Sequence, residues 1–249
     1  MDTPIDTLST SAPKPGYDPL YRQVKRRLIE RIAAGEWPPG GGLPSETHLA
    51  AELGVSQGTV RKALDELASE NLVVRRQGRG TFVSEHDQQR TLFQFFKITS
   101  DSGKRQFPET TFATRAIRKA NSKERKALSL EKGASVWQVL RHRSLEGRVL
   151  VVERIVLAAE MFPDFDRHEP LPNNVYRLYE RGYGLTVTRA VEELRAVACR
   201  KDDAAALGCR EGDPVLRVDR IGYGITGKTI ELRESICLTD KVHYLSDLH

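Results

Sequence analysis

Apolar residues in the first third of the chain repeat with the spacing of helices. They predict a first helix beginning at Asp18-Pro19, where the acid would cap the helix and the proline would occupy its first turn. After a loop rich in proline and glycine, a second helix is expected over residues 45–53. Gly54 then breaks the pattern and Ser56 begins a third helix. Two short helices joined by a tight glycine turn are typical of a helix-turn-helix.

Two short apolar runs, at residues 72–74 and 81–83, follow the third helix. Glycines and arginines separate them, and this order predicts a β-hairpin with a basic tip. Each of these patterns also occurs alone in proteins that do not bind DNA. In such proteins the apolar face of a helix only packs against the core, and an arginine-rich turn is only exposed to solvent. Their succession within residues 17–84 favours a winged helix-turn-helix.

The residues expected to face DNA lie on the polar sides of these elements. The first residues of the second helix of such a motif approach base edges, and glycines in a wing allow close approach to phosphate or the minor groove. The predicted contacts on the third helix and the hairpin are Ser56, Gln57, Gly58, Thr59, Arg61, Lys62, Arg75, Arg79 and Gly80.

Strand-like alternation dominates the remaining two thirds of the chain. The expected strands cover residues 136–143, 149–157, 191–197, 215–223 and 230–238, and the expected helices cover residues 122–128, 175–181 and 201–207. Residues 127–153 also parallel residues 206–231, because in both a helix ends in Ala-Leu and a glycine turn leads into two alternating runs. A duplicated helix-plus-hairpin predicts an α+β domain around one antiparallel sheet.

Composition narrows the class of protein. The net charge is +5, and basic residues exceed acidic residues both in residues 17–84 and in residues 85–249. Total charge therefore does not locate a DNA site. Cys199, Cys209 and Cys237 are scattered without C-x-x-C spacing, which predicts neither a disulfide framework nor a zinc site and suits a reducing cytoplasm. Residues 1–16 read as a disordered tail without the features of a secretory signal, and no apolar run is long enough for a membrane span.

Residues 19–83 resemble the DNA-binding domain of the GntR family. The resemblance rests on LPSE at 43–46, VSQGTVRKAL at 55–64 and GRGTFV at 78–83. It implies operator binding through the recognition helix, the wing tip and the start of the second helix, which adds Ser45 and Glu46 to the predicted contacts. The family often carries arginine where this chain has Gln57. Because arginine prefers guanine and glutamine prefers adenine, Gln57 either alters the half-site preference or contacts phosphate only.

Residues 92–246 resemble the UTRA effector domain, which is similar to chorismate lyase in fold. This resemblance places the chain in the HutC subfamily and implies a small-molecule effector and homodimerisation rather than catalysis. The expected organisation is a tail at 1–16, a winged helix-turn-helix at 17–84, a linker at 85–91 and an effector-binding and dimerisation domain at 92–249.

A candidate effector site follows from the strand pattern. Arg141 and Arg143 are two residues apart on one strand and therefore share a face, and paired guanidinium groups suit a carboxylate or a phosphate. Glu153 lies among apolar neighbours, where a carboxylate needs a partner. The UTRA resemblance implies a ligand site at Arg141, Arg143, Glu153 and Glu231, with Asn174 where many members carry serine and Cys237 where an aromatic residue is usual. A purely structural ion pair between Arg141 and Glu153 is the alternative.

Three other functions fit the sequence less well than a ligand-responsive regulator does. An enzyme is suggested by the lyase-like fold, but the sequence has no nucleophile–base spacing, metal motif or phosphate loop. An all-helical ligand domain conflicts with the strand alternation, and a pyridoxal-phosphate-dependent regulator would need a longer chain. The sequence therefore predicts a cytoplasmic regulator and favours a repressor over an activator. The expected partners are operator DNA, a small anionic effector and a second copy of the chain. No cofactor, metal or membrane is expected.

Overall fold

The computed structural model describes residues 18–85, 95–101 and 108–246. The tail expected at residues 1–16 and all of the expected linker except Glu85 lie outside the described residues. Among the helices of the described ranges, none has both the length and the apolar character that crossing a membrane requires.

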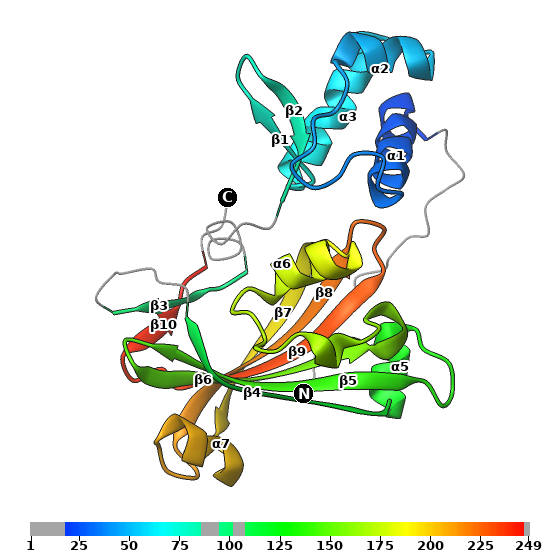
Figure 1. Ribbon diagram of the computed structural model, residues 1–249. Coiled ribbons are helices and arrows are strands. Elements are labelled where there is room, and N and C mark those ends of the chain that lie inside the picture. The colour runs from blue at the N-terminus through cyan, green and yellow to red at the C-terminus, as the bar shows by residue number, and fades with distance from the viewer. Residues whose placement is uncertain (1–17, 86–94, 102–107, 247–249) are drawn as a thin grey trace, which may run out of the picture.

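The N-terminal unit contains three helices followed by a two-stranded antiparallel wing (Figure 1). The elements are α1 (Leu20–Ala33), α2 (Glu46–Leu53), α3 (Gln57–Ser69), β1 (Val73–Arg76) and β2 (Gly80–Val83). Leucines and valines from all three helices are fully buried between them, so the predicted apolar stripes form one core. The helix-turn-helix and the wing are thereby confirmed as structural elements.

Local capping explains where two of these helices begin. The Ser45 and Ser56 hydroxyls accept hydrogen bonds from the main-chain amides of His48 and Thr59, each at 3.2 Å. Gly54 has φ of 65°, a left-handed conformation that favours glycine, and it ends α2. The predicted cap of α1 is wrong: Pro19 occupies the cap position without a side-chain bond, because the Asp18 carboxylate instead pairs with Arg26.

The C-terminal unit is built on a six-stranded antiparallel sheet with the strand order β4-β5-β6-β9-β8-β7. The strands are β4 (Glu109–Lys119), β5 (Ser135–Leu145), β6 (Arg148–Ala158), β7 (Val187–Ala198), β8 (Pro214–Gly224) and β9 (Thr229–Cys237). The pattern predicted five of them. It missed β4 because this edge strand has no buried residue and lacks apolar alternation. It also missed the three-residue strands β3 (Ile98–Ser100) and β10 (Val242–Tyr244), which pair with each other.

Helices cover both faces of this sheet. On one face lies α6 (Val175–Tyr183), with the short 3-10 turns η1 (Ala159–Met161) and η2 (Phe165–Arg167) completing an aromatic core. On the other face lie α5 (Ser122–Leu128) and α7 (Lys201–Leu207), which pack against different strands (Figure 1). The expected α+β architecture is therefore observed.

The internal repeat is larger than the sequence pattern indicated. Each half has the order strand, helix, strand, strand: β4-α5-β5-β6 in the first and β7-α7-β8-β9 in the second. The two halves join where β6 pairs with β9, so the strand order reads symmetrically from this junction to either edge.

The core of the N-terminal unit yields a stability prediction. Leu28 and Leu20 lie on the same helix, but Leu28 is 0% exposed whereas Leu20 is 44% exposed. We expect Leu28→Ala to lower the free energy of unfolding by about 2–5 kcal/mol, because it leaves a cavity, and the control Leu20→Ala by less than about 1 kcal/mol. Urea denaturation measures both, and equal losses would contradict the assignment of the core.

Candidate functional site

The Glu46 carboxylate connects the three elements that carry the predicted DNA contacts. It accepts hydrogen bonds from Arg61 Nε at 2.9 Å and Gln57 Nε2 at 3.3 Å, both on α3, and it pairs with Arg75 of β1 at 3.2 Å. The Glu46 side chain is only 19% exposed, whereas that of Arg61 is 57% exposed. The acid at the start of α2 therefore fixes basic and polar side chains whose outer sides face solvent.

The remaining predicted DNA contacts lie at three places: the start of α3, a later position on α3, and the wing turn. Ser56 and Thr59 bond to each other through their hydroxyls at 2.8 Å at the start of α3, next to Gly58. Lys62 lies elsewhere on α3, with its ammonium 4.1 Å from the centre of the Tyr21 ring of α1. Arg79 is exposed in the wing turn, which its main-chain amide helps to close.

Glycines shape that wing turn. Gly78 and Gly80 both have positive φ, of 69° and 108°, so the turn requires residues without a side chain there. The wing projects away from the sheet of the C-terminal unit (Figure 1). Its arginines are consequently available on an outer surface.

A second group of predicted residues is buried between the sheet and α6. Arg141 and Glu153 stand directly opposite each other on β5 and β6, and Arg141 Nε donates to Glu153 Oε2 at 2.9 Å. Arg233 of β9 donates to the other carboxylate oxygen at 3.3 Å. Burial alone would raise the pKa of Glu153, but the guanidinium groups of Arg141 and Arg233 hold it well below its usual range. The ion pair considered as an alternative for Arg141 and Glu153 is present in the structure.

Glu231 is the second buried carboxylate of this region, with no exposed surface. It accepts hydrogen bonds from the hydroxyls of Tyr176 at 2.7 Å and Tyr179 at 3.1 Å, and from Arg233 at 2.9 Å. Burial, followed by the charge of Glu231, raises the pKa of Tyr176 to about 12. The same two causes raise the pKa of Tyr179, so both tyrosines stay protonated and act as donors.

Arg143 lies beside this carboxylate network and is 2% exposed. It donates to the main-chain carbonyl oxygens of Asn173 at 2.9 Å and Pro108 at 2.8 Å. Burial and the neighbouring charge of Arg141 lower the pKa of Arg143 to about 9. Its positive charge is thus held in surroundings that disfavour it, and a nearby anion would relieve this cost.

Asn174 and Cys237, the two further positions that the UTRA resemblance named, lie at different places around these charged residues. Asn174 caps α6, where its side-chain oxygen accepts from the main-chain amide of Arg177 at 3.1 Å. Cys237 is buried and lines a small cavity on the β3–β10 side of Glu153. The sheet thus brings Arg141, Arg143, Glu153 and Glu231 together, with Asn174 at their margin.

Sequence reasoning missed Arg220 as a member of this site. Arg220 of β8 donates to Glu192 at 2.6 Å, to the Tyr176 hydroxyl at 3.3 Å and to the main-chain carbonyl of Phe95. The internal repeat contained the signal that could have found it. When the repeated stretches are superposed on Val136 and Val215, Arg141 coincides with Arg220.

The arginine–glutamate cluster, as we name this region, leaves little empty space. It comprises Arg141, Arg143, Arg220, Arg233, Glu153, Glu192 and Glu231. Two cavities of about 20 and 30 Å³ adjoin it, and Phe95 lines both of them. The Phe95 ring packs edge-on against Tyr176, with 4.9 Å between the ring centres.

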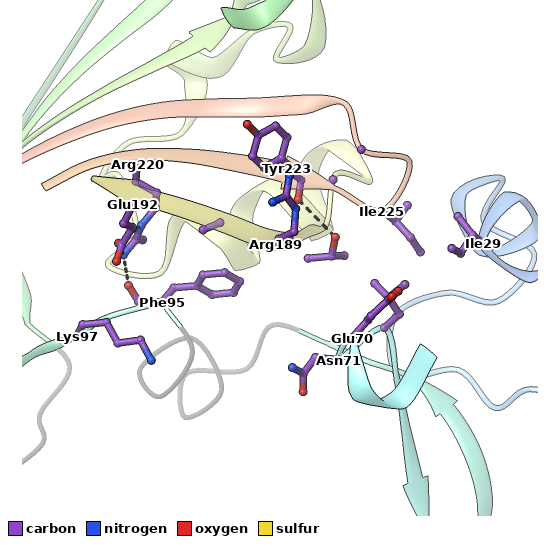
Figure 2. A pocket seen from close by; sticks show the side chains of 15 residues that line it. Ile29, Glu70, Asn71, Phe95, Lys97, Arg189, Glu192, Arg220, Tyr223 and Ile225 are labelled. Carbon is purple, nitrogen blue, oxygen red and sulfur yellow. Dashed lines mark hydrogen bonds and ion pairs between the residues drawn. The ribbon is translucent and has the colours of Figure 1, made fainter. Parts of the chain in front are cut away.

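A larger cavity of about 610 Å³ lies between the two units. Figure 2 shows Arg220 and Phe95 at one end of it and Ile225 and Ile29 at the other. Ile225, from the turn between β8 and β9, packs against the core of the N-terminal unit. Strand β8 and the turn that follows it therefore lead from the arginine–glutamate cluster to the core of the N-terminal unit. Within the described ranges, no group of three His, Cys, Asp or Glu side chains has the arrangement of a metal site.

Comparisons with known proteins match both parts of the chain. Residues 20–83 match the gntR family of bacterial regulatory proteins, and residues 103–243 match the UTRA domain. The chain is 31% identical to the transcriptional repressor NagR of Bacillus subtilis, over 92% of this chain and 96% of that protein. It is 30% identical to the histidine utilization repressor of Pseudomonas putida, over 88% of each chain.

Solved structures support the same assignment. The ligand-binding domain of a GntR-family regulator from Bordetella bronchiseptica superposes with a TM-score of 0.56 at 29% identity, over 61% of this chain and 96% of that one. PhnF from Mycobacterium smegmatis shares the fold, with a TM-score of 0.54 at 23% identity, over 91% of this chain and 99% of that one. The protein therefore belongs to the GntR family, with a UTRA domain of the HutC type, and it is a transcription regulator rather than an enzyme.

Proposed function

We propose that the protein is a cytoplasmic repressor that binds double-stranded operator DNA as a homodimer and responds to a small anion bound at the arginine–glutamate cluster. The observation that carries the proposal is the charge of this cluster. Among the described residues, four guanidinium groups lie with three carboxylates in a largely buried region, which gives this cluster one positive charge in excess. A carboxylate or phosphate on the ligand would balance this excess.

Arg143 is the group best placed to receive the anion. Glu153 already holds Arg141 and Arg233, and Glu192 holds Arg220. Arg143 lines the cavity of about 20 Å³ beside Glu153 and donates to main-chain carbonyls, and burial lowers its pKa because its charge is costly there. In this proposal Glu153 and Glu231 orient the arginines and tyrosines and accept from ligand hydroxyl or amine groups, while Asn174 lines the cavity of about 20 Å³.

The effector must displace side chains to enter, because cavities of about 20 and 30 Å³ hold no more than a water molecule or two. Phe95 lines both cavities, and its carbonyl accepts from Arg220. In sequence, Phe95 follows closely on the end of the DNA-binding unit. A ligand that moves Phe95 would bind one arrangement of the two units better than another, as a change in operator affinity requires.

Repression and dimerisation rest on further support. The relatives cited above carry the name repressor, as does the Escherichia coli protein named for the mannosyl-D-glycerate transport/metabolism system, at 28% identity. The two edge strands of the sheet leave large apolar side chains exposed, which suits burial against a second copy: Phe112, Ile117, Val191 and Leu194. A two-fold dimer would present one recognition helix to each half of a pseudo-palindromic operator, and a monomer both free and on DNA would contradict this.

DNA binding can be tested with two arginines that are exposed on different elements. We expect Arg61→Ala to weaken operator binding roughly 5–150-fold and relax the sequence preference at one position, because Arg61 would lose a base contact. We expect Arg79→Ala to reduce the slope of log affinity against log salt by about 1, because it would lose a phosphate contact. Fluorescence anisotropy with operator DNA measures both effects.

The control for this experiment is Arg167→Ala, which removes one exposed positive charge from the C-terminal unit. Its affinity and salt slope should match those of the unaltered protein. Unchanged affinity in both Arg61→Ala and Arg79→Ala would contradict the proposed DNA surface.

The effector site can be tested with Arg143→Gln, which keeps a polar side chain but removes the charge. We expect effector affinity to fall at least tenfold, because a charge-assisted contact is lost, while effector-free DNA binding stays within about threefold. Isothermal titration with an anionic metabolite found by thermal-shift screening measures the first quantity, and anisotropy measures the second. The matched control is Arg148→Gln on the neighbouring strand, where the arginine is exposed and pairs with Asp240 at 2.8 Å.

Thermal unfolding distinguishes a binding role from a purely structural one. If Arg143 only braces the fold, Arg143→Gln lowers the midpoint temperature and impairs DNA binding and effector binding together. A stable Arg143→Gln protein with a normal effector response would refute the proposed ligand contact.

A further inference from the structure

Two cysteines that are distant from the arginine–glutamate cluster lie side by side at the ends of α7. Cys199 precedes the helix and Cys209 follows it, and their sulfur atoms are 3.6 Å apart. Both are free thiols. A disulfide needs a sulfur–sulfur distance of about 2.05 Å, so the two atoms need to approach by about 1.5 Å. The third cysteine, Cys237, lies on β9 in a different apolar cluster.

Main-chain hydrogen bonds hold this pair in place. The Cys199 amide donates to the Asp213 carbonyl at 2.8 Å, and the Gly212 amide donates to the Cys199 carbonyl at 2.9 Å. These bonds tie the loop after Cys209 back to the residue before α7. The main-chain bonds between the segment before α7 and the segment after it therefore hold the two sulfur atoms close together.

The two thiols differ in access, as a reactive cysteine and its resolving partner do. Cys199 is 3% exposed, and burial together with its contact to Cys209 raises the pKa of Cys199 to about 11. Cys209 is half-buried and lines a surface cavity of about 540 Å³ that also includes Arg148 and Asp213. A small reagent can thus reach the region of Cys209 first.

We propose that Cys199 and Cys209 form a redox-active dithiol, which closes to an intramolecular disulfide when the protein meets a hydroperoxide. The Cys209 thiolate attacks one peroxide oxygen, the O–O bond breaks, and protonation of the departing oxygen gives water (for hydrogen peroxide) and a sulfenic acid. The Cys199 sulfur then attacks the Cys209 sulfur, the S–O bond breaks, and the thiol proton leaves with hydroxide as a second water. Two thiols lose two electrons in total, and the peroxide gains them.

Reduction restores the starting state. A thiolate from a small dithiol attacks one sulfur of the disulfide, forms a mixed disulfide and is then displaced by its own second thiol. The modification is therefore reversible and takes place on the face of the sheet opposite to α6, so it does not require an effector at the arginine–glutamate cluster.

The test uses the full-length protein and three serine variants: Cys199→Ser, Cys209→Ser and Cys237→Ser. Each reduced protein is treated with a small excess of hydrogen peroxide, its remaining thiols are alkylated after denaturation, and its intact mass is measured. We expect the unaltered protein and Cys237→Ser to carry two fewer alkyl groups after peroxide treatment, with the disulfide itself about 2 Da lighter than the dithiol, and we expect dithiothreitol to restore both thiols. Cys199→Ser should instead give a sulfenic acid at Cys209 that dimedone traps, and Cys209→Ser should not form the disulfide.

Circular dichroism and operator binding show whether each variant is folded. If the buried Cys199→Ser change prevents folding, Cys209→Ser is used as the only variant of the pair. The proposal is overturned if all three thiols survive peroxide, if Cys209 passes to sulfinic acid without cross-linking, or if the disulfide joins two chains or includes Cys237. Peptide mapping after proteolysis identifies which sulfur atoms are joined.

Discussion

The buried carboxylate of Glu153, held between two guanidinium groups, is the interaction on which the effector domain depends. It joins β5 through Arg141 to β9 through Arg233, so one side chain connects strands on both sides of β6. Removing one partner from such a group leaves an uncompensated buried charge, which costs about 3–5 kcal/mol. The hydroxyls of α6 then bond to Glu231, and this ties the covering helix to the same network. The position of α6, and therefore the shape of any ligand site beneath it, follows from these charges.

The DNA-binding unit uses a smaller version of the same principle. Glu46 holds polar side chains of α3 and the wing strand, so their placement depends on one carboxylate at the start of α2. A contact surface that is ordered before it meets DNA loses less conformational entropy on binding. In the proposed DNA surface, the Glu46 carboxylate thus holds two arginines in place before any contact with DNA.

The sequence predicted the elements whose periodicity reflects burial. The six helices, the wing and the five strands with apolar alternation were found, and all of them except the edge strand β7, in which only Val187 is buried, bury one face in a core. The edge strand β4 was missed since neither of its faces is deeply buried, and Asp18 was assigned a cap because its competing partner Arg26 could not be seen in the local pattern. The structure brings together Arg141, Arg143, Glu153 and Glu231, which the strand pattern and the UTRA resemblance had grouped, while their contact with a ligand stays a prediction. Arg220, Tyr176 and Phe95 were not, because their meeting depends on how α6 and the segment before β3 fold over the sheet.

The symmetry of the strand order has a consequence for the origin of the site. Arg141 and Arg220 occupy equivalent positions in the two repeats, and they stand opposite Glu153 and Arg233, respectively, on the two strands that meet at the junction of β6 and β9. A single repeat would bury Glu153 without Arg233 and would expose β6 as an open edge. The polar centre is thus a property of two joined copies, and an ancestor with one repeat would have needed to self-associate to possess it. Because the two halves have diverged, each supplies a different set of donors to the same buried space.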